Sequence, residues 1–305
     1  MDLRTRYLGL ELKHPLVASA SPISRTLDGI KRLEDGNAAA IVLSSLFEEH
    51  CQRGADVDEA FGPDAYLDLI RRAVDATDVP IIASLNGITD RGWTTHAKAI
   101  SDAGAAALEL NVYYIPADLE TTSAEVEQRY VDVLKSAKHA VNIPVAMKLS
   151  PYFSAFGAMA RRLVDEGGAD GLVLFNRFYQ PDIDLAKLTV LPTLELSEPH
   201  EARLPLLWIA VLCRRVQASI AATTGVHRPE QVIKYLLAGA DVVMTTSSLL
   251  KEGPQHMADL LRGLAQWMHD RDYTSVDRIR GALSHSQAAD PTAFVRTNYV
   301  DTLKG

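Results

Sequence analysis

The 305-residue sequence predicts an α/β protein that folds as a closed (β/α)₈ (TIM) barrel. Two observations lead to this prediction. Short apolar runs alternate with helix-length segments, and one unit recurs four times: a helical stretch, a glycine beside an acidic or small residue, one or two alanines, then a β-run. Glycine is favoured at a helix C-terminus because a left-handed residue there satisfies the last carbonyls. Eight strictly alternating units in this length fit a closed barrel better than an open doubly wound sheet.

The expected elements follow from this alternation, in chain order. Eight short apolar runs bounded by turn residues are the expected strands: 16–19, 40–43, 79–84, 107–110, 143–147, 172–175, 218–221 and 242–244. The helices are expected at about 26–36, 63–76, 90–103, 122–141, 153–166, 207–217, 228–238 and 254–270. Residues 7–12 predict an N-terminal hairpin at the barrel bottom, and 177–206 predict an insertion after strand six. Without a linker-like stretch, we expect one domain over residues 1–305.

Composition excludes several classes of protein. The net charge of −8 disfavours broad nucleic-acid binding, and two cysteines are too few for a disulfide framework or a metal site. The longest apolar stretch, 204–213, is far shorter than the roughly 20 residues that span a bilayer. The N-terminus lacks the pattern of a secretory signal, so we expect a cytoplasmic protein without membrane contact.

Polar residues gather where the predicted strands end, the face on which such barrels carry their chemistry. Lys148 closes strand five, and a buried ammonium requires a compensating anion, acceptor or ligand. One asparagine alone is most simply a turn residue, but three on the same face as a lysine indicate a binding site for a flat heterocycle. The strand-end residues are Ser19, Ala20, Ser44, Ser45, Asn86, Asn111, Lys148, Asn176 and Arg177.

The loops after strands seven and eight carry a second signal. They are 223–225 and 245–248, rich in Thr and Ser, and each precedes a predicted helix. Backbone amides and hydroxyls at such positions form the habitual phosphate site of this barrel. Ordinary helix capping explains either loop singly but explains the adjacent pair less well. A phosphorylated ligand is therefore expected.

Motifs of competing chemistries are absent from the sequence. It contains no G-x-G-x-x-G, no H-E-x-x-H and no G-x-S-x-G, and Trp93 stands where a P-loop requires lysine after Gly87 and Gly92. These absences exclude the usual dinucleotide fingerprint and the zinc- and serine-hydrolase motifs.

With these residues in place, the chain resembles the dihydroorotate dehydrogenase family of FMN-binding (β/α)₈ barrels. The similarity runs from about residue 7 to residue 254 and is strongest in 107–111, 145–153 and 222–225. Residues 174–184 and 208–210 are similar to a divergent dihydroorotate dehydrogenase-like branch.

The resemblance implies FMN as cofactor and a role in pyrimidine biosynthesis. It implies that Lys148 contacts the flavin near N1 and O2 and stabilises the anionic reduced ring, so that the cofactor is the partner the lysine requires. Asn111 and Asn176 would lie by the ring and substrate, and Gly225 would help to hold the phosphate. The full cofactor-binding set expected is Ser19, Ala20, Ser44, Asn86, Asn111, Lys148, Asn176, Thr224, Gly225, Thr246 and Ser247.

The chain departs from the family pattern at the substrate side. Family members carry N-x-S-C-P-N or its serine variant after strand four, and this Cys or Ser is the base that removes the substrate proton. Here the run is N-V-Y-Y-I-P, with Tyr114 at that place. Ser44 replaces the lysine common after strand two, and Arg177 replaces the serine after Asn176. The flavin site is thus retained, whereas the dihydroorotate site differs.

These departures suggest a reductase acting on an activated C=C bond. A tyrosine with an ordinary pKa near 10 is a poor base but a serviceable acid, so Tyr114 or Tyr113 would protonate carbon while flavin N5 gives hydride. Arg177 would clamp a substrate carboxylate in bidentate fashion. Equally, the tyrosines could pack over the flavin while Arg177 forms a surface ion pair.

Two other functions stay open. On the same barrel, Lys148 could form a Schiff base in an aldolase whose substrate carries the phosphate. The chain could also be a flavin-binding accessory or electron-transfer subunit without dihydroorotate activity, working with a redox partner protein. A homodimer is compatible with the helical outer surface.

Overall fold

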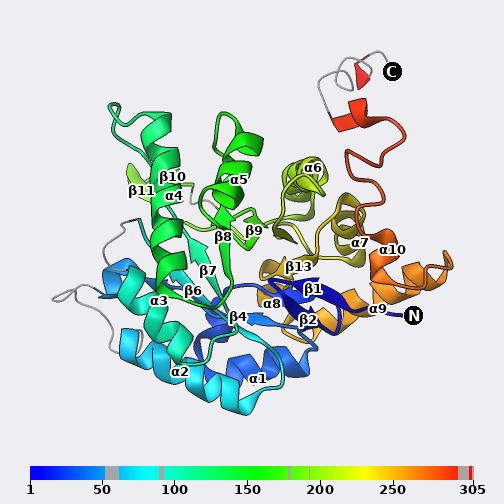
Figure 1. Cartoon of the computed structure of the whole chain (residues 1–305), viewed down its shortest axis with the longest axis horizontal. Coiled ribbons are helices and arrows are strands. Elements are labelled where there is room, and N and C mark those ends of the chain that lie inside the picture. The colour runs from blue at the N-terminus through cyan, green and yellow to red at the C-terminus, as the bar shows by residue number, and fades with distance from the viewer. Residues whose placement is uncertain (52–61, 89–92, 178–179, 192, 295–301, 304–305) are drawn as a thin grey trace.

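The computed structural model describes residues 1–51, 62–88, 93–177, 180–191, 193–294 and 302–303. It shows a closed barrel of parallel strands surrounded by helices, which confirms the predicted fold class (Figure 1). The barrel strands are β3 (Leu16–Ala18), β4 (Ile41–Val42), β6 (Ile81–Asn86), β7 (Ala107–Asn111), β8 (Val145–Leu149), β9 (Gly171–Leu174), β12 (Ser219–Ala222) and β13 (Val242–Thr245). Each pairs with the next, and β13 pairs with β3, which closes the circle. A short extra strand, β5 (Leu46–Phe47), continues along the end of β6.

The helices follow the predicted alternation with one clear shift. They are α1 (Leu27–Asp35), α2 (Pro63–Ala76), α3 (Trp93–Asp102), α4 (Ser123–Ala140), α5 (Phe156–Asp165), α6 (Arg203–Leu212), α7 (Pro229–Ala238), α8 (Ser247–Glu252), α9 (His256–His269) and α10 (Val276–Ile279). The expected helix at 207–217 is wrong at both ends. The observed α6 takes Pro205 into its first turn, where proline is tolerated, and ends before Arg214, whose φ of 62° is left-handed.

The N-terminal hairpin lies at the bottom of the barrel, as predicted. Strands β1 (Thr5–Tyr7) and β2 (Leu10–Leu12) pair antiparallel through a two-residue turn in which Leu8 and Gly9 both have positive φ. Tyr7 and Leu12 are buried against the interior side chains of the barrel strands. The lower end of the barrel is therefore closed by apolar packing.

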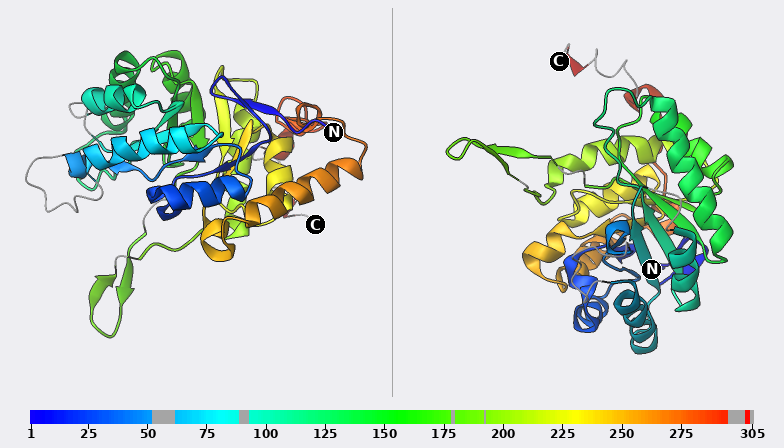
Figure 2. Two further views of the ribbon diagram at one scale, coloured as in Figure 1. Left: turned by 90° about the horizontal axis from the view of Figure 1, so that it is seen from below. Right: turned by 90° about the vertical axis from the view of Figure 1, so that its left-hand side faces the viewer.

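The predicted insertion after the sixth barrel strand contains a second hairpin. Strands β10 (Asp182–Asp184) and β11 (Thr189–Leu191) pair antiparallel and extend away from the barrel (Figure 2). The chain then returns through a 3₁₀ turn at Pro199–Ala202 into α6. The return brings residues 194–197 over the ends of the barrel strands.

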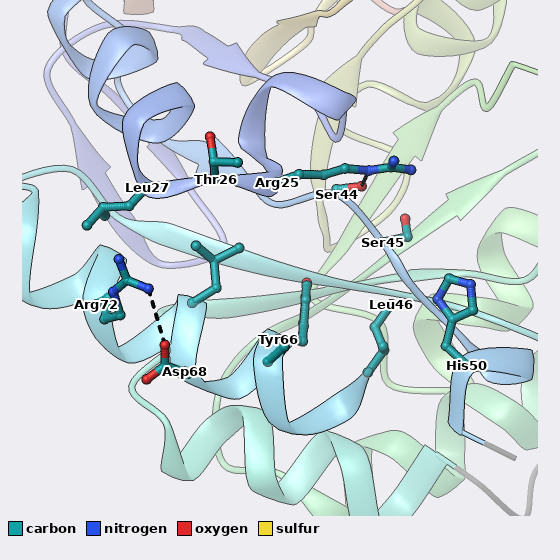
Figure 3. A pocket seen from close by; sticks show the side chains of 12 residues that line it. Arg25, Thr26, Leu27, Ser44, Ser45, Leu46, His50, Tyr66, Asp68 and Arg72 are labelled. Atoms are coloured by element: carbon teal, nitrogen blue, oxygen red, sulfur yellow. Dashed lines mark hydrogen bonds and ion pairs between the residues drawn. The ribbon is translucent and has the colours of Figure 1, made fainter. Parts of the chain in front are cut away.

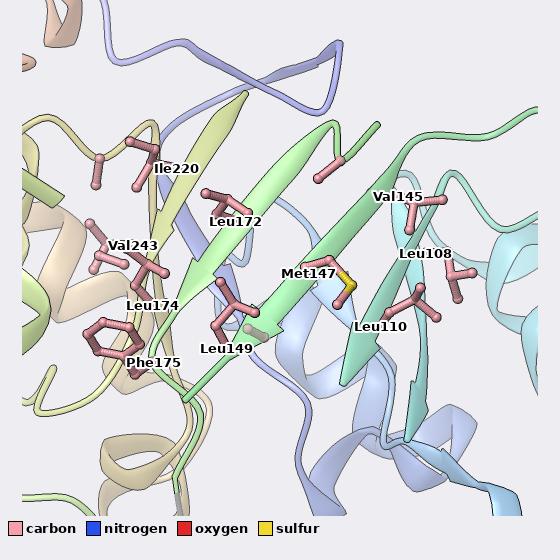
Figure 4. Close-up of a cluster of buried hydrophobic side chains, with 14 of the residues drawn as sticks. Leu108, Leu110, Val145, Met147, Leu149, Leu172, Leu174, Phe175, Ile220 and Val243 are labelled. Carbon is pink, nitrogen blue, oxygen red and sulfur yellow. The ribbon is translucent and has the colours of Figure 1, made fainter. Parts of the chain in front are cut away.

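Side chains along the barrel strands alternate between two apolar clusters, as the two-residue period of a strand requires. On β7, Leu108 and Leu110 belong to the cluster that also contains the apolar side chains of the helices. Figure 4 shows both leucines among other members of this cluster. Ala107 belongs to the interior cluster, so Glu109 and Asn111 also face the interior. This alternation places polar side chains inside the barrel near its carboxyl end.

Candidate active site

A cavity of about 250 Å³ opens at the carboxyl ends of the barrel strands. It brings together residues that follow four of the strands and residues 194–197 of the insertion. Nine of the site residues predicted from the sequence line it: Ser19, Ala20, Lys148, Asn176, Arg177, Thr224, Gly225, Thr246 and Ser247.

Lys148 is the buried cation of this cavity. Its ammonium lies 3.2 Å from Oε1 of Glu109 and donates to Oγ of Ser19 over 3.4 Å. Glu109 thus supplies an anion to Lys148 within the chain itself, and the expected contact of Lys148 with the cofactor stays a prediction. Sequence reasoning counted Glu109 only as part of a β-run. Glu109 stands two residues before Asn111, so both side chains lie on the same face of the strand, and this spacing could have indicated that Glu109 faces the site.

Glu109 is buried inside the barrel. It is 1% exposed, and its Oε2 atom has no hydrogen-bond partner among the described residues. Burial raises the pKa of Tyr7 and of Tyr66 far above the ordinary range, and the charge of Glu109 adds to both shifts. The Tyr66 hydroxyl also accepts from the backbone N–H of Ser84, which lies beside Glu109 in the sheet. The carboxylate thus relies on Lys148 for its compensation.

The asparagines above this ion pair form a second polar layer. Asn176 donates from Nδ2 to Oδ1 of Asn111 over 2.9 Å, which joins the ends of β9 and β7 across β8. Asn111 lies between Asn86 and Lys148 in the strand register. Asn176 lines the cavity. Asn111, which accepts the hydrogen bond from Asn176, and Asn86 on the neighbouring strand are not among the lining residues.

The opposite end of the cavity is rich in N–H and hydroxyl groups. Gly225 donates its backbone N–H to Oγ of Ser197, whose own N–H donates to Oγ of Ser247. Thr224 and Gly225 both have positive φ, and a Cβ on Gly225 would come 2.8 Å from the Glu198 carbonyl. The close approach and left-handed backbone require glycine there. Ser197 was missed, because nothing in its local sequence distinguishes it within the insertion.

Ser44 lies apart from this cavity. It accepts from Nε of Arg25 over 3.2 Å and lines a second cavity of about 310 Å³ between α1 and α2 (Figure 3). That cavity includes the surface ion pair of Asp68 and Arg72. We assign the chemistry to the barrel mouth instead, because the buried cation and the asparagine pair lie there.

The three residues proposed for substrate chemistry have different surroundings. The guanidinium of Arg129 lies 4.1 Å from the ring centroid of Tyr114. Arg177 lines the cavity, pairs with the Glu201 carboxylate and donates to the Glu195 carbonyl. Tyr114 and its half-buried neighbour Tyr113 are not part of the cavity lining. Their catalytic roles remain predictions.

The donor set of the cavity fits FMN. A buried ammonium and an amide N–H suit the carbonyl-rich edge of an isoalloxazine ring, and hydroxyls with backbone N–H groups suit a phosphate. Lys148 and Asn176 would hold the ring, while Ser197, Gly225 and Ser247 would hold the phosphate. Within the described ranges, no group of three or more His, Cys, Asp or Glu residues could hold a metal ion.

None of the described helices is long and apolar enough to cross a membrane.

Comparison with known proteins identifies the family. The model of the dihydroorotate dehydrogenase family matches residues 59–268. The catalytic subunit of dihydroorotate dehydrogenase B (NAD⁺) from Methanothermobacter thermautotrophicus is 24% identical over 302 residues, covering 93% of this chain and 98% of the relative. The same subunit from Methanocaldococcus jannaschii is 27% identical over 274 residues, which cover 82% of this chain and 88% of the relative. The subunit from Methanocella arvoryzae is 27% identical over 296 residues, which cover 91% of this chain and 96% of the relative. The chain belongs to the dihydroorotate dehydrogenase family and is an FMN-dependent oxidoreductase of that type.

Proposed function

We propose that the protein transfers hydride between FMN and a carbon–carbon bond of a small carboxylated heterocycle related to dihydroorotate. The observation that carries this proposal is the gathering of Lys148, the Asn111–Asn176 pair and the Ser197–Ser247 pair around one cavity. A cation, paired amides and a hydroxyl cluster are what a phosphorylated flavin requires.

Bound FMN would supply the two-electron chemistry, and the chain would supply binding, orientation and charge. Lys148 would compensate negative charge that develops on the ring. Asn176, held by Asn111, would present its amide to ring or substrate. Arg177 lines the same cavity, and it would bind a substrate carboxylate in place of Glu201, the carboxylate with which it pairs in this structure.

We infer that the favoured direction is reduction of an activated C=C bond. Tyr114 occupies the place of the family's Cys or Ser base, and a phenol is better suited to give a proton than to take one. Arg129 stacks on its ring and is held near it by α4. In this proposal Tyr114, or its neighbour Tyr113, protonates the carbon next to the one that accepts hydride.

A protein partner for electron transfer is part of the proposal. The three relatives are named as catalytic subunits of dihydroorotate dehydrogenase B (NAD⁺), which supports a separate subunit that exchanges electrons with the flavin. The alternative of a Schiff-base aldolase is less well supported, because the Lys148 ammonium is engaged by Glu109. An accessory flavoprotein without dihydroorotate activity remains the second candidate, supported by the replacement of the family base by Tyr114.

A homodimer is also proposed. The hairpin of β10 and β11 extends from the barrel (Figure 2). Four large apolar side chains on it are exposed. They are Ile183, Leu185, Leu188 and Val190, between 61% and 83% exposed. Exposed apolar clusters of this kind mark protein–protein contacts in soluble proteins.

The visible spectrum of the purified protein tests the function. We expect a flavin spectrum with one FMN per chain, reduction by dithionite, and anaerobic reoxidation by orotate or another carboxylated cyclic enone or enamide. Colourless protein that borohydride traps covalently with a carbonyl substrate would establish the aldolase instead. A yellow protein whose reduced form reacts with no such acceptor but passes electrons to a partner flavoprotein would establish the accessory role.

A further inference from the structure

Burial of the Glu109 carboxylate costs free energy, and FMN binding alone does not explain why the protein retains it. Barrel interiors are packed with apolar side chains, and an ionised carboxylate there is unfavourable unless it is paired. We propose that Glu109 positions Lys148 while the flavin is oxidised and takes up one proton when the flavin is reduced. The inference rests on FMN occupying the barrel-mouth cavity.

The contacts of Glu109 make its charge depend on Lys148. Oε1 lies 3.2 Å from the Lys148 ammonium, whereas Oε2 is buried without a hydrogen-bond partner among the described residues. Hydrogen bonds to its oxygens stabilise the charged form of a buried carboxylate. Lys148 is therefore the cation that compensates the Glu109 carboxylate.

Reduction of the flavin changes the charge count around Lys148. In the oxidised state, one cation and one carboxylate balance each other. A reduced flavin with negative charge near Lys148 would leave two anions sharing one buried cation. Two like charges in one buried site raise the proton affinity of one of them, and the carboxylate with an unsatisfied oxygen is the group that can accept a proton.

The other titratable groups that face Glu109 do not compete for this role. Besides Lys148 on β8, these are Tyr66 from α2 and Tyr7 from β1, whose pKa values are both raised by burial and by the charge of Glu109. Both phenols are already protonated at neutral pH and cannot take up another proton.

The step balances with two electrons and two protons. Bound FMN would gain two electrons from the reductant and one proton from solvent, and Glu109 would take the second proton from solvent, which neutralises its carboxylate. The O–H bond on Glu109 is the one bond that forms in the chain. On reoxidation, the proton returns to solvent as Lys148 again compensates Glu109.

The pH dependence of the flavin midpoint potential tests this coupling in the intact holoprotein. Each proton taken up with two electrons contributes about 30 mV per pH unit. We expect a slope of about 59 mV per pH unit in the wild type across neutral pH and about 30 mV in Glu109→Gln. The matched control is Glu166→Gln, an exposed carboxylate at the C-terminal end of α5, which should keep the wild-type slope. A wild-type slope near 30 mV, or an unchanged slope in Glu109→Gln, overturns the proposal.

Infrared difference spectra keep the proposal testable if Glu109→Gln loses FMN. Reduction should produce a protonated-carboxyl C=O band in the wild type, and Glu109→Asp should shift that band. Its absence from the wild type, or an unshifted band in Glu109→Asp, overturns the proposal. These measurements use dithionite and no substrate, so a holoprotein that reduces without proton uptake at Glu109 refutes this inference alone. A protein that does not bind FMN refutes the proposed function.

Discussion

The guanidinium of Arg129, on α4, stacks at 4.1 Å over the ring of Tyr114, in the loop that follows β7. A cation over an aromatic face is attracted by the ring quadrupole, by about 0.5–1 kcal/mol at exposed sites. The contact fixes the half-buried tyrosine against the helix that follows it in the chain. Any role of Tyr114 in proton transfer therefore depends on a residue outside the cavity.

Replacing Tyr114 by Phe should remove turnover while leaving bound FMN intact. The ring and its contact with Arg129 remain, but the proton donor is lost, and general acids typically contribute 10²–10⁴-fold. This step is measured by mixing the reduced variant with substrate under anaerobic conditions and recording the reoxidation of the flavin by stopped-flow absorbance. Tyr113→Phe is the matched control if Tyr114 is the acid. Turnover that stays at the wild-type rate in both variants would eliminate the acid role of the tyrosines.

Replacing Lys148 by Met should strongly destabilise the protein. The change leaves Glu109 as an uncompensated buried charge, and breaking such a pair by removing one partner costs about 3–5 kcal/mol. The double variant Lys148→Met/Glu109→Gln should recover a large part of this loss. Urea unfolding of the wild type, both single variants and the double variant gives the coupling energy. Additive losses would show that the two side chains do not interact energetically.

Replacing Ser197 by Ala should weaken FMN binding but not riboflavin binding. The Ser197 hydroxyl accepts from Gly225 and bonds with Ser247 at the end of the cavity assigned to the phosphate. One such hydrogen bond contributes about 1 kcal/mol, and hydrogen bonds to charged groups about 1.5–3 kcal/mol, so we expect roughly a tenfold or larger rise in the FMN Kd. Fluorescence titration of apoprotein with both flavins measures it, with Ser136→Ala on α4 as control. An equal loss of affinity for both flavins would contradict the assignment of the phosphate to this end of the cavity.

The stability of the protein should fall as the pH falls from about 6.5 to about 4. Burial lowers the pKa of His14 from 6.5 to about 4, with a further contribution from the charge of Lys13. The unfolded chain then binds more protons than the native one in this window, so stability rises with pH there and is lost on acidification. The full shift corresponds to roughly 3 kcal/mol. Urea unfolding across this pH range should show a weaker dependence for His14→Gln than for the wild type or the exposed-site control His269→Gln. Parallel pH profiles would exclude His14 as the cause.

Charged residues on the β10–β11 hairpin should weaken the proposed homodimer. Leu185 and Leu188 are 82% and 83% exposed in the chain, so Leu185→Asp/Leu188→Asp should leave the monomer's unfolding unchanged. We expect analytical ultracentrifugation to show a dimer for the wild type and a shift toward monomer for the double variant. The matched surface control is Val74→Asp on α2, a side chain 39% exposed away from the hairpin. A wild-type monomer, or a dimer unaffected by the hairpin variant, contradicts the prediction.

The barrel could be predicted because its signals are local. Each strand is a short apolar run, and each helix has its own length and end signals, so neither depends on distant contacts. The closing pair of β13 with β3 then follows from counting eight units. The cavity residues could be placed for the same reason, since parallel strands bring their carboxyl ends to one face.

The parts that could not be predicted depend on contacts between distant segments. Ser197 joins Gly225 and Ser247 only after the insertion folds back, and sequence spacing does not encode that return. Ser44 was placed at the mouth by the same strand-end rule as Lys148. However, β4 ends at Val42 and the chain continues into β5 along β6, which turns Ser44 toward the cavity between α1 and α2.

The contact between Ser197 and the two loops has a consequence for assembly of the holoenzyme. The segment that completes the cavity wall belongs to the insertion that also carries the projecting hairpin. By reciprocity, a ligand that binds more tightly when Ser197 is packed against the two loops stabilises that packing by the same free energy. A flavin that contacts Ser197 would therefore also stabilise the base of the projecting hairpin, the part of the chain proposed to contact a second copy.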